Sequence, residues 1–219
     1  MKTALLVTVV VALAMGLSFR ESVAGTPTMW ALLAAPYVVL AGVALRKLAQ
    51  DGTLSEQLRP RAGDFTIGFV VAGVLYGAGF IVRHFLLTDG SQRFGWLLRL
   101  SFQLGGMRPS PALLGIVLFM ALLEELVWRG LVLTSVTESL GSRRAPPVAA
   151  FAYGLAHVPT IVTLSDPIAG PNPTLVFAAL GCGLVWSFGA QLAGRLPPIV
   201  VSHAIFSYFA FSTLLPRFG

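Results

Sequence analysis

Charged residues are scarce in this sequence. Only 11% of its 219 residues are Asp, Glu, Lys or Arg, whereas 56% are hydrophobic, and the mean hydropathy is +0.81. This number of charged side chains is too small to cover the surface of a soluble globular protein of this length. The composition excludes an ordinary soluble domain and predicts a membrane protein with several spans.

Cysteine is rarer still. Cys182 is the single cysteine and lies in an apolar stretch, so the chain can form neither an internal disulfide nor a cysteine metal cluster. The net charge is +6, but the basic residues fall in short groups between apolar stretches, where they set membrane topology rather than bind phosphates. No nucleic-acid partner is expected.

Seven apolar stretches approach or reach the length of a membrane span. Crossing about 30 Å of hydrocarbon takes roughly 20 mostly apolar residues. The stretches are residues 3–19, 29–45, 65–87, 111–136, 148–164, 174–193 and 198–215. We therefore expect an all-α fold, a polytopic membrane helix bundle of about seven transmembrane helices.

Small residues four positions apart let helices approach closely in lipid. They predict contact faces at Gly73 and Gly77, and at Ala179, Gly183 and Ser187.

Two regions are expected along the chain. Residues 1–110 form an N-terminal transmembrane region with an interfacial segment, because RFGWLLRLSFQL, residues 93–104, is aromatic and basic enough for an amphipathic helix. Residues 111–215 form the helix bundle that holds the candidate site. Small residues at 22–24 would suit signal-peptide cleavage, but the charges just before them argue against it.

Positive charges favour one orientation in the membrane. With seven spans, eight Lys and Arg residues lie on the side of the N-terminus and five on the other side. Positive residues gather on the cytoplasmic side, so a cytoplasmic N-terminus is expected. The eight are Lys2, Arg46, Lys47, Arg59, Arg61, Arg143, Arg144 and Arg195, and the five are Arg20, Arg93, Arg99, Arg108 and Arg217.

Five ionisable residues lie well inside the apolar stretches: Glu124, Glu125, Arg129, His157 and His203. A carboxylate at the bilayer centre costs at least about 2.5 to 3.5 kcal/mol to insert, so each such group needs a partner or a function. The five come from three separate stretches. This distribution suggests one polar site within the bundle.

The two adjacent glutamates are expected to have different partners. Glu125 and Arg129 have the four-residue spacing at which helical side chains meet, so their charges offset each other. Glu124 is rotated by about 100° from Glu125, so its partner should come from another helix. His157 and His203 are available, and each can accept or donate a proton. We predict that Glu125 is structural and that Glu124 is a catalytic acid facing both histidines.

Such a site has the groups needed to hydrolyse an amide bond. Glu124 beside His157, shielded from bulk water, can remove a proton from a bound water. His203 and Ser207, four residues apart on one helix face, could supply N–H and O–H donors for the oxyanion. Glu124, His157 and His203 also match the ligand set of a catalytic zinc, although no HExxH spacing is present, so zinc stays an alternative.

Three short motifs resemble those of one family. EELVWR, residues 124–129, matches the EExxxR motif of the CPBP intramembrane proteases, which include the Rce1-type CAAX prenyl endopeptidases and the bacterial Abi proteins. Residues 153–157 resemble the family's FxxxH motif with Tyr for Phe, and residues 203–207 resemble HxxxN with Ser for Asn. The order of the motifs and their placement in separate apolar stretches agree with that family.

The resemblance implies a role for each position. Glu124 and His157 would activate the attacking water, and His203 and Ser207 would stabilise the oxyanion. It favours metal-free, glutamate-type catalysis over zinc, so no cofactor is expected. The supporting residues would be Glu125, Arg129 and Tyr153.

The implied function is an intramembrane endopeptidase that cleaves a membrane-associated or lipidated protein or peptide. We expect a multi-pass protein of a bacterial plasma (inner) membrane, surrounded by membrane lipids, with its site opening toward the cytoplasm. Two alternatives stay open. One is a non-catalytic membrane interaction or immunity protein with the same fold, favoured by Ser207 in place of Asn, and the other is a transporter with a proton-coupled Glu–His pair.

Overall fold

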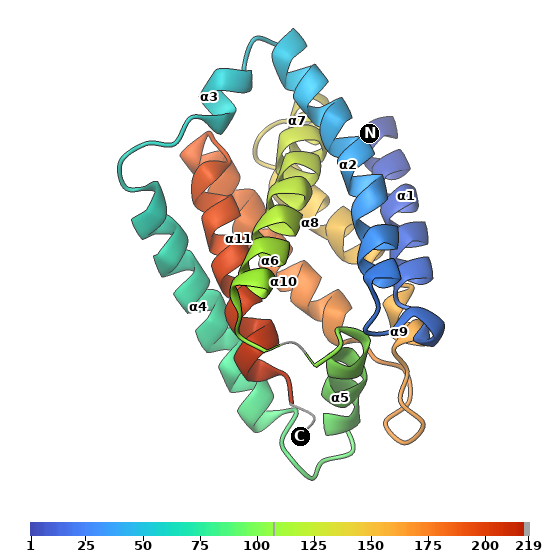
Figure 1. The fold of residues 1–219 in the computed structure, drawn as a ribbon. Helices are drawn as coiled ribbons and strands as arrows, with labels where there is room; N and C mark the ends of the chain where they lie inside the picture. Colours follow the sequence, from blue (N-terminus) through green and yellow to red (C-terminus); the bar gives the residue numbers. More distant parts are fainter. Residues whose placement is uncertain (107, 217–219) are drawn as a thin grey trace.

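The computed structural model describes residues 1–106 and 108–216, and it consists of helices joined by short loops (Figure 1). Six helices are long and apolar enough to cross a membrane, and a shorter apolar helix precedes them. The prediction of an all-α, polytopic membrane helix bundle with about seven spans is confirmed. Arg217, one of the residues in the charge comparison, lies outside the described residues.

The helices follow the predicted apolar stretches closely. They are α1 (Lys2–Ser18), η1 (Glu21–Val23), α2 (Pro27–Gln50), α3 (Leu54–Leu58), α4 (Asp64–Phe85), α5 (Phe94–Gln103), α6 (Pro111–Glu125), η2 (Leu126–Leu133), α7 (Thr134–Leu140), α8 (Ala145–Ala156), α9 (Thr160–Thr163), α10 (Thr174–Ala193), α11 (Pro197–Phe209) and η3 (Ala210–Leu214). The segments η2 and η3 are π-helices, and η1 is a 3₁₀-helix.

Proline and serine mark where the helices of the site begin. Pro111 and Pro197 occupy the first turns of α6 and α11, where a missing backbone N–H breaks no helical hydrogen bond. The Ser110 hydroxyl accepts a hydrogen bond from the backbone N–H of Leu113 at 3.1 Å and so caps α6. These starts fix the positions of the two helices that carry the glutamates and His203.

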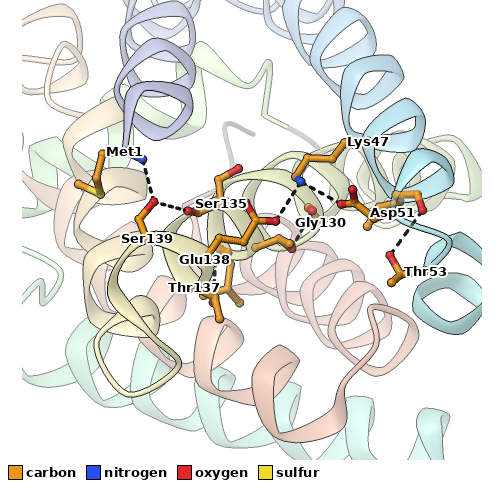
Figure 2. A network of polar contacts seen from close by, with 12 residues as sticks. Met1, Lys47, Asp51, Thr53, Gly130, Ser135, Thr137, Glu138 and Ser139 are labelled. Atoms are coloured by element: carbon orange, nitrogen blue, oxygen red, sulfur yellow. Dashed lines mark hydrogen bonds and ion pairs between the residues drawn. The ribbon is translucent and has the colours of Figure 1, made fainter.

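The bundle has two distinct ends (Figure 1). The N-terminus, α3 and α7 lie at one end, called here the N-terminal end, whereas α5, α9 and the end of η3 lie at the opposite end. Figure 2 shows the polar contacts that join α1, α2 and α7 at the N-terminal end: Lys47 donates to Asp51 and to Glu138 at 2.9 Å each, and the Met1 amine donates to Ser139 at 3.3 Å.

The hydrophobic core extends across most of the chain. Buried apolar side chains from α1 through α11 form one cluster, which includes Val7 and Val11 of α1 and Ile199 of α11. Helix α1 is therefore part of the packed bundle. The division into two regions at residue 110 stays a prediction, and the core is shared between them.

Helix α4 packs along α11, and at the N-terminal end it is tied to Arg195 in the loop just before α11. Asp64 is 1% exposed, and its Oδ1 accepts from Nη2 and Nε of Arg195 at 2.6 and 3.0 Å. One turn later, the Gly68 backbone lies against Val201, where an added Cβ would come within 2.5 Å of Val201 Cγ1. Ion pair and glycine contact together hold α11 in place.

The structure confirms one of the two predicted small-residue contact faces and contradicts the other. Ala179, Gly183 and Ser187 are buried on α10, and Gly183 lies against Tyr153 of α8, so this prediction is confirmed. No described atom lies within 4 Å of a Cβ built at Gly73 or Gly77, so the prediction of a contact face there is wrong. Those two positions of α4 face away from the bundle.

Candidate active site

The candidate residues of α6, α8 and α11 surround one cavity of about 140 Å³ inside the bundle. Its polar lining includes Glu124, Tyr153, His157, His203 and Ser207. Glu124 and Ser207, the first and last of these residues in the sequence, are 83 positions apart. The fold therefore brings the three sequence motifs to a single place.

Glu124 is half-buried, and its partner comes from another helix, as expected. That partner is Tyr153 of α8, whose hydroxyl donates to Glu124 Oε2 at 2.8 Å. The expectation that a histidine would be the direct partner is wrong, although His157 and His203 line the same cavity. The other oxygen of Glu124 makes no hydrogen bond with a described residue and is available to a ligand.

Glu125 has the partner expected from its spacing and a second one that was not expected. It is fully buried, and its Oε1 accepts from Arg129 Nη1 at 3.1 Å and lies 2.7 Å from His203 Nδ1. The sequence assigned His203 to Glu124, but α11 packs against the side of α6 that carries Glu125. Glu125 thus connects Arg129 to His203.

Arg129 lies in the π-helical segment η2 that directly follows the glutamates. Its Nη2 donates to the carbonyl oxygen of Gly183 at 3.3 Å, and its guanidinium lies 5.1 Å from the Tyr153 ring centre and 5.5 Å from that of Trp186. Such cation–π contacts favour a buried cation. Arg129 therefore joins α6 and η2 to α8 and α10.

His157 stands at a break in the predicted stretch 148–164. Helix α8 ends at Ala156, and the chain resumes a helix only at Thr160, after Pro159. His157 Nδ1 lies 2.8 Å from the carbonyl oxygen of Tyr153. Because a carbonyl oxygen can only accept, Nδ1 carries the hydrogen, and the neutral ring presents its lone pair at Nε2.

His203 is held from two sides. Its ring stacks on Trp186, with centres 4.0 Å apart and planes at 20°, while Nδ1 contacts Glu125. Ser207, one turn later, makes no side-chain hydrogen bond with a described residue, unlike Thr213, which bonds the carbonyl oxygen four residues before it. The Ser207 hydroxyl is therefore available to a ligand in the cavity.

Beyond these polar groups, the cavity extends toward the end of the bundle opposite the N-terminus. The further lining residues include Met15 near the end of α1, Trp30 near the start of α2 and Leu175 near the start of α10, all at that end (Figure 1). The sequence predicted a site that opens on the side of the N-terminus. The lining residues contradict that part of the prediction.

Sequence reasoning missed most of the apolar and aromatic lining, including Tyr37, Cys182 and Trp186. Aromatic and small residues are common in apolar spans, so nothing in the pattern distinguished them. The hydroxyl of Tyr153 was the one available signal, because a phenol at a position where the resembled motif carries Phe needs a hydrogen-bond partner when buried.

The zinc alternative was tested against the positions of its proposed ligands. Among residues 1–106 and 108–216, no group of three or more His, Cys, Asp and Glu side chains is placed to hold a metal ion. His203 directs Nδ1 to Glu125 and His157 directs Nδ1 to a carbonyl oxygen, which leaves Nε2 of both rings free. The described positions therefore do not assemble the trio into a metal site, and no catalytic step is assigned to a metal.

Comparison with known proteins gives one match. Residues 106–209 match the family model described as type II CAAX prenyl endopeptidase Rce1-like. That range contains all three motifs and, of the cavity lining, Glu124, Tyr153, His157, His203 and Ser207. No curated protein and no solved structure matches the chain.

Proposed function

Because this multi-pass membrane protein carries a domain of the Rce1-like type II CAAX prenyl endopeptidase family over residues 106–209, as its motifs predicted, we propose that it hydrolyses peptide bonds within the membrane. The family implies an endopeptidase with a protein or peptide substrate. The observation that supports the proposal most is the convergence of Glu124, His157, His203 and Ser207 on one cavity.

Glu124 and His157 activate the attacking water in this proposal. The Tyr153 hydroxyl engages Glu124 Oε2 and leaves the other oxygen to accept a proton from water. His157 Nε2 accepts the second water hydrogen and orients the oxygen lone pair. As the water oxygen bonds to the substrate carbonyl carbon, its proton passes to Glu124 and the carbonyl oxygen becomes an oxyanion.

His203 and Ser207 stabilise that oxyanion. Glu125 holds Nδ1 of His203, so that an N–H at Nε2 would point to the oxyanion in the cavity, where Ser207 adds an O–H donor. Donors fixed in advance in a low-dielectric site stabilise developing charge more strongly than they would in water. Glu125 acts through His203 and is a positioning residue.

The intermediate then collapses in the usual way for general acid–base hydrolysis. The C–N bond breaks, and the proton taken up by Glu124 passes to the leaving nitrogen. The immediate products are a carboxylic acid and an amine, and the two oxygens of the acid are the former carbonyl and water oxygens. The remaining proton of the acid then passes to the amine, which leaves a carboxylate and an ammonium group. The substrate class proposed is a membrane-associated or lipidated protein or peptide, since the rest of the cavity is apolar.

The proposal is tested by cleavage of tagged candidate membrane peptides in cells that produce the protein. Glu124→Gln and His157→Gln are each expected to lower product formation by about 100-fold or more, the contribution typical of a general base. Glu56→Gln, an exposed glutamate of α3 far from the cavity, serves as the control. Undiminished cleavage by the Glu124 variant would refute the proposal.

A further inference from the structure

A second, larger cavity lies between α4, α5, α10 and η3, at the end of the bundle opposite the N-terminus. Its volume is about 660 Å³, within the roughly 300–1,000 Å³ of small-molecule sites. The interior is formed by apolar side chains, among them Leu75, Val82, Leu97, Phe177 and Leu214. A polar or charged ligand could not be accommodated in this interior without a large desolvation penalty.

The rim of the cavity is polar. Arg83 is paired with Asp89 at 2.5 Å and donates to the Leu87 carbonyl oxygen, so its charge is compensated. Arg93 makes no ion pair with any described residue. Thr174 contributes a buried hydroxyl oxygen that has no hydrogen-bond partner among residues 1–106 and 108–216. The rim thus offers one positive charge without an ion-pair partner, beside a buried hydroxyl oxygen without a hydrogen-bond partner among the described residues.

The placement of these groups matches the layers of a membrane. The rim lies where α4 ends, α5 begins and α10 begins, at one end of the bundle (Figure 1). The apolar interior lies along the spanning helices. Lipid headgroups are found at the ends of transmembrane helices and acyl chains along their length, and arginine near the surface attracts anionic lipid.

We propose that this cavity binds an anionic phospholipid, whose acyl chain occupies the apolar interior and whose phosphate group contacts Arg93 at the rim. Arg93 favours an anionic lipid, because a zwitterionic lipid would place a second positive charge beside it. The proposal does not depend on the protease function. The two cavities share five lining residues, so the acyl chain would lie beside the candidate active site. The five are Leu175, Ala178, Cys182, Phe206 and Phe211.

The headgroup contact is tested with purified full-length protein in detergent. Phosphatidylglycerol and phosphatidylcholine with identical acyl chains are titrated, and binding is followed by the midpoint of thermal unfolding and by retained lipid in native mass spectrometry. Phosphatidylglycerol is expected to bind more tightly. Arg93→Gln should weaken its apparent affinity about fivefold and leave that of phosphatidylcholine unchanged. Arg20→Gln, an exposed arginine at the same end, is the matched control.

The acyl-chain contact is tested by filling the cavity. Gly181 lines it, and an added Cβ there meets no described atom within 4 Å, so Gly181→Leu can place its side chain in the open space. This variant should lose binding of phosphatidylglycerol. Gly73→Leu is the control, because Gly73 also has open space around its Cβ but does not line the cavity.

Three results would overturn the proposal. Equal affinity for the two lipids would remove the headgroup contact, and wild-type binding by Gly181→Leu would place the lipid elsewhere. A lipidated peptide that displaces phosphatidylglycerol at lower concentration would assign the cavity to substrate instead. Because every readout is lipid binding, failure here is distinguishable from failure of the protease proposal.

Discussion

The two adjacent glutamates differ in burial and in partners. Glu125 is fully buried between Arg129 and His203, whereas Glu124 is half-buried and bonds Tyr153 at the cavity. A buried charge that loses its partner is strongly destabilising, while a carboxylate at a cavity can be exchanged with less effect on folding. Stability and activity should therefore separate between neighbouring positions.

The matched pair Glu125→Gln and Glu124→Gln tests this separation. Glu125→Gln leaves the buried Arg129 guanidinium without a carboxylate and should lower the free energy of unfolding by about 3–5 kcal/mol. Glu124→Gln keeps an acceptor for Tyr153 and should stay within about 0.5 kcal/mol of the wild type. Denaturant unfolding in detergent measures both. Equal losses of unfolding free energy would show that the two glutamates contribute equally to stability.

The Tyr153 hydroxyl gives a second prediction. Tyr153→Phe keeps the ring contacts with Trp128 and His157 but removes the hydrogen bond to Glu124. We expect the cleavage rate at saturating substrate to fall about tenfold, the equivalent of about 1.4 kcal/mol, with little change in thermal stability. Tyr76→Phe, which removes a phenol outside the site, is the control. An unchanged rate would mean that the hydroxyl does not position Glu124.

At the scale of the elements, the sequence predicted the existence of the helices well, because a long apolar stretch has few alternatives to a helix in lipid. The Glu125–Arg129 pair was also predictable, since both residues lie on one continuous helical segment. The π-helix after Glu125 was not predicted, because residue spacing does not distinguish it from an α-helix. The break at His157 had a signal in Pro159, which the predicted stretch 148–164 passed over. The contacts of Glu124 with Tyr153 and of Glu125 with His203 depend on the rotation of neighbouring helices, which residue spacing does not encode.

The contact between α4 and α11 gives a prediction at this scale. Gly68→Ala would place its Cβ 2.5 Å from Val201 Cγ1 and 2.9 Å from the Pro198 carbonyl oxygen. The helices must move apart, and overpacking of this kind costs about 1–3 kcal/mol of unfolding free energy. Gly73→Ala, on the same helix in open space, should have no such cost. Chemical denaturation of the two variants compares them, and equal stability would mean that the close contact is absent.

At the scale of the whole molecule, most basic residues lie at one end of the bundle, whereas the cavity of the candidate site extends toward the other end. Most basic residues outside the spans lie at the N-terminal end, which predicts that this end is cytoplasmic. The cavity extends toward the opposite end. If the charge rule holds, the apolar part of the site lies in the half of the membrane that is farther from the cytoplasm.

Cysteine labelling tests that orientation. In a Cys182→Ala background, Ser142→Cys in the exposed loop before α8 should react with a membrane-impermeant maleimide only after cells are permeabilised. Ser22→Cys, exposed at the opposite end, should react in intact cells. The reverse pattern would place the N-terminal end outside and the cavity on the cytoplasmic side.

The central claim is that Glu124 enables peptide-bond hydrolysis inside the membrane. The most direct measurement reconstitutes the purified protein with membrane proteins in liposomes and identifies new N-termini by mass spectrometry. New N-termini are predicted with the wild type and with the control Glu56→Gln, and none of them with Glu124→Gln. The same set of new N-termini from Glu124→Gln would contradict the account.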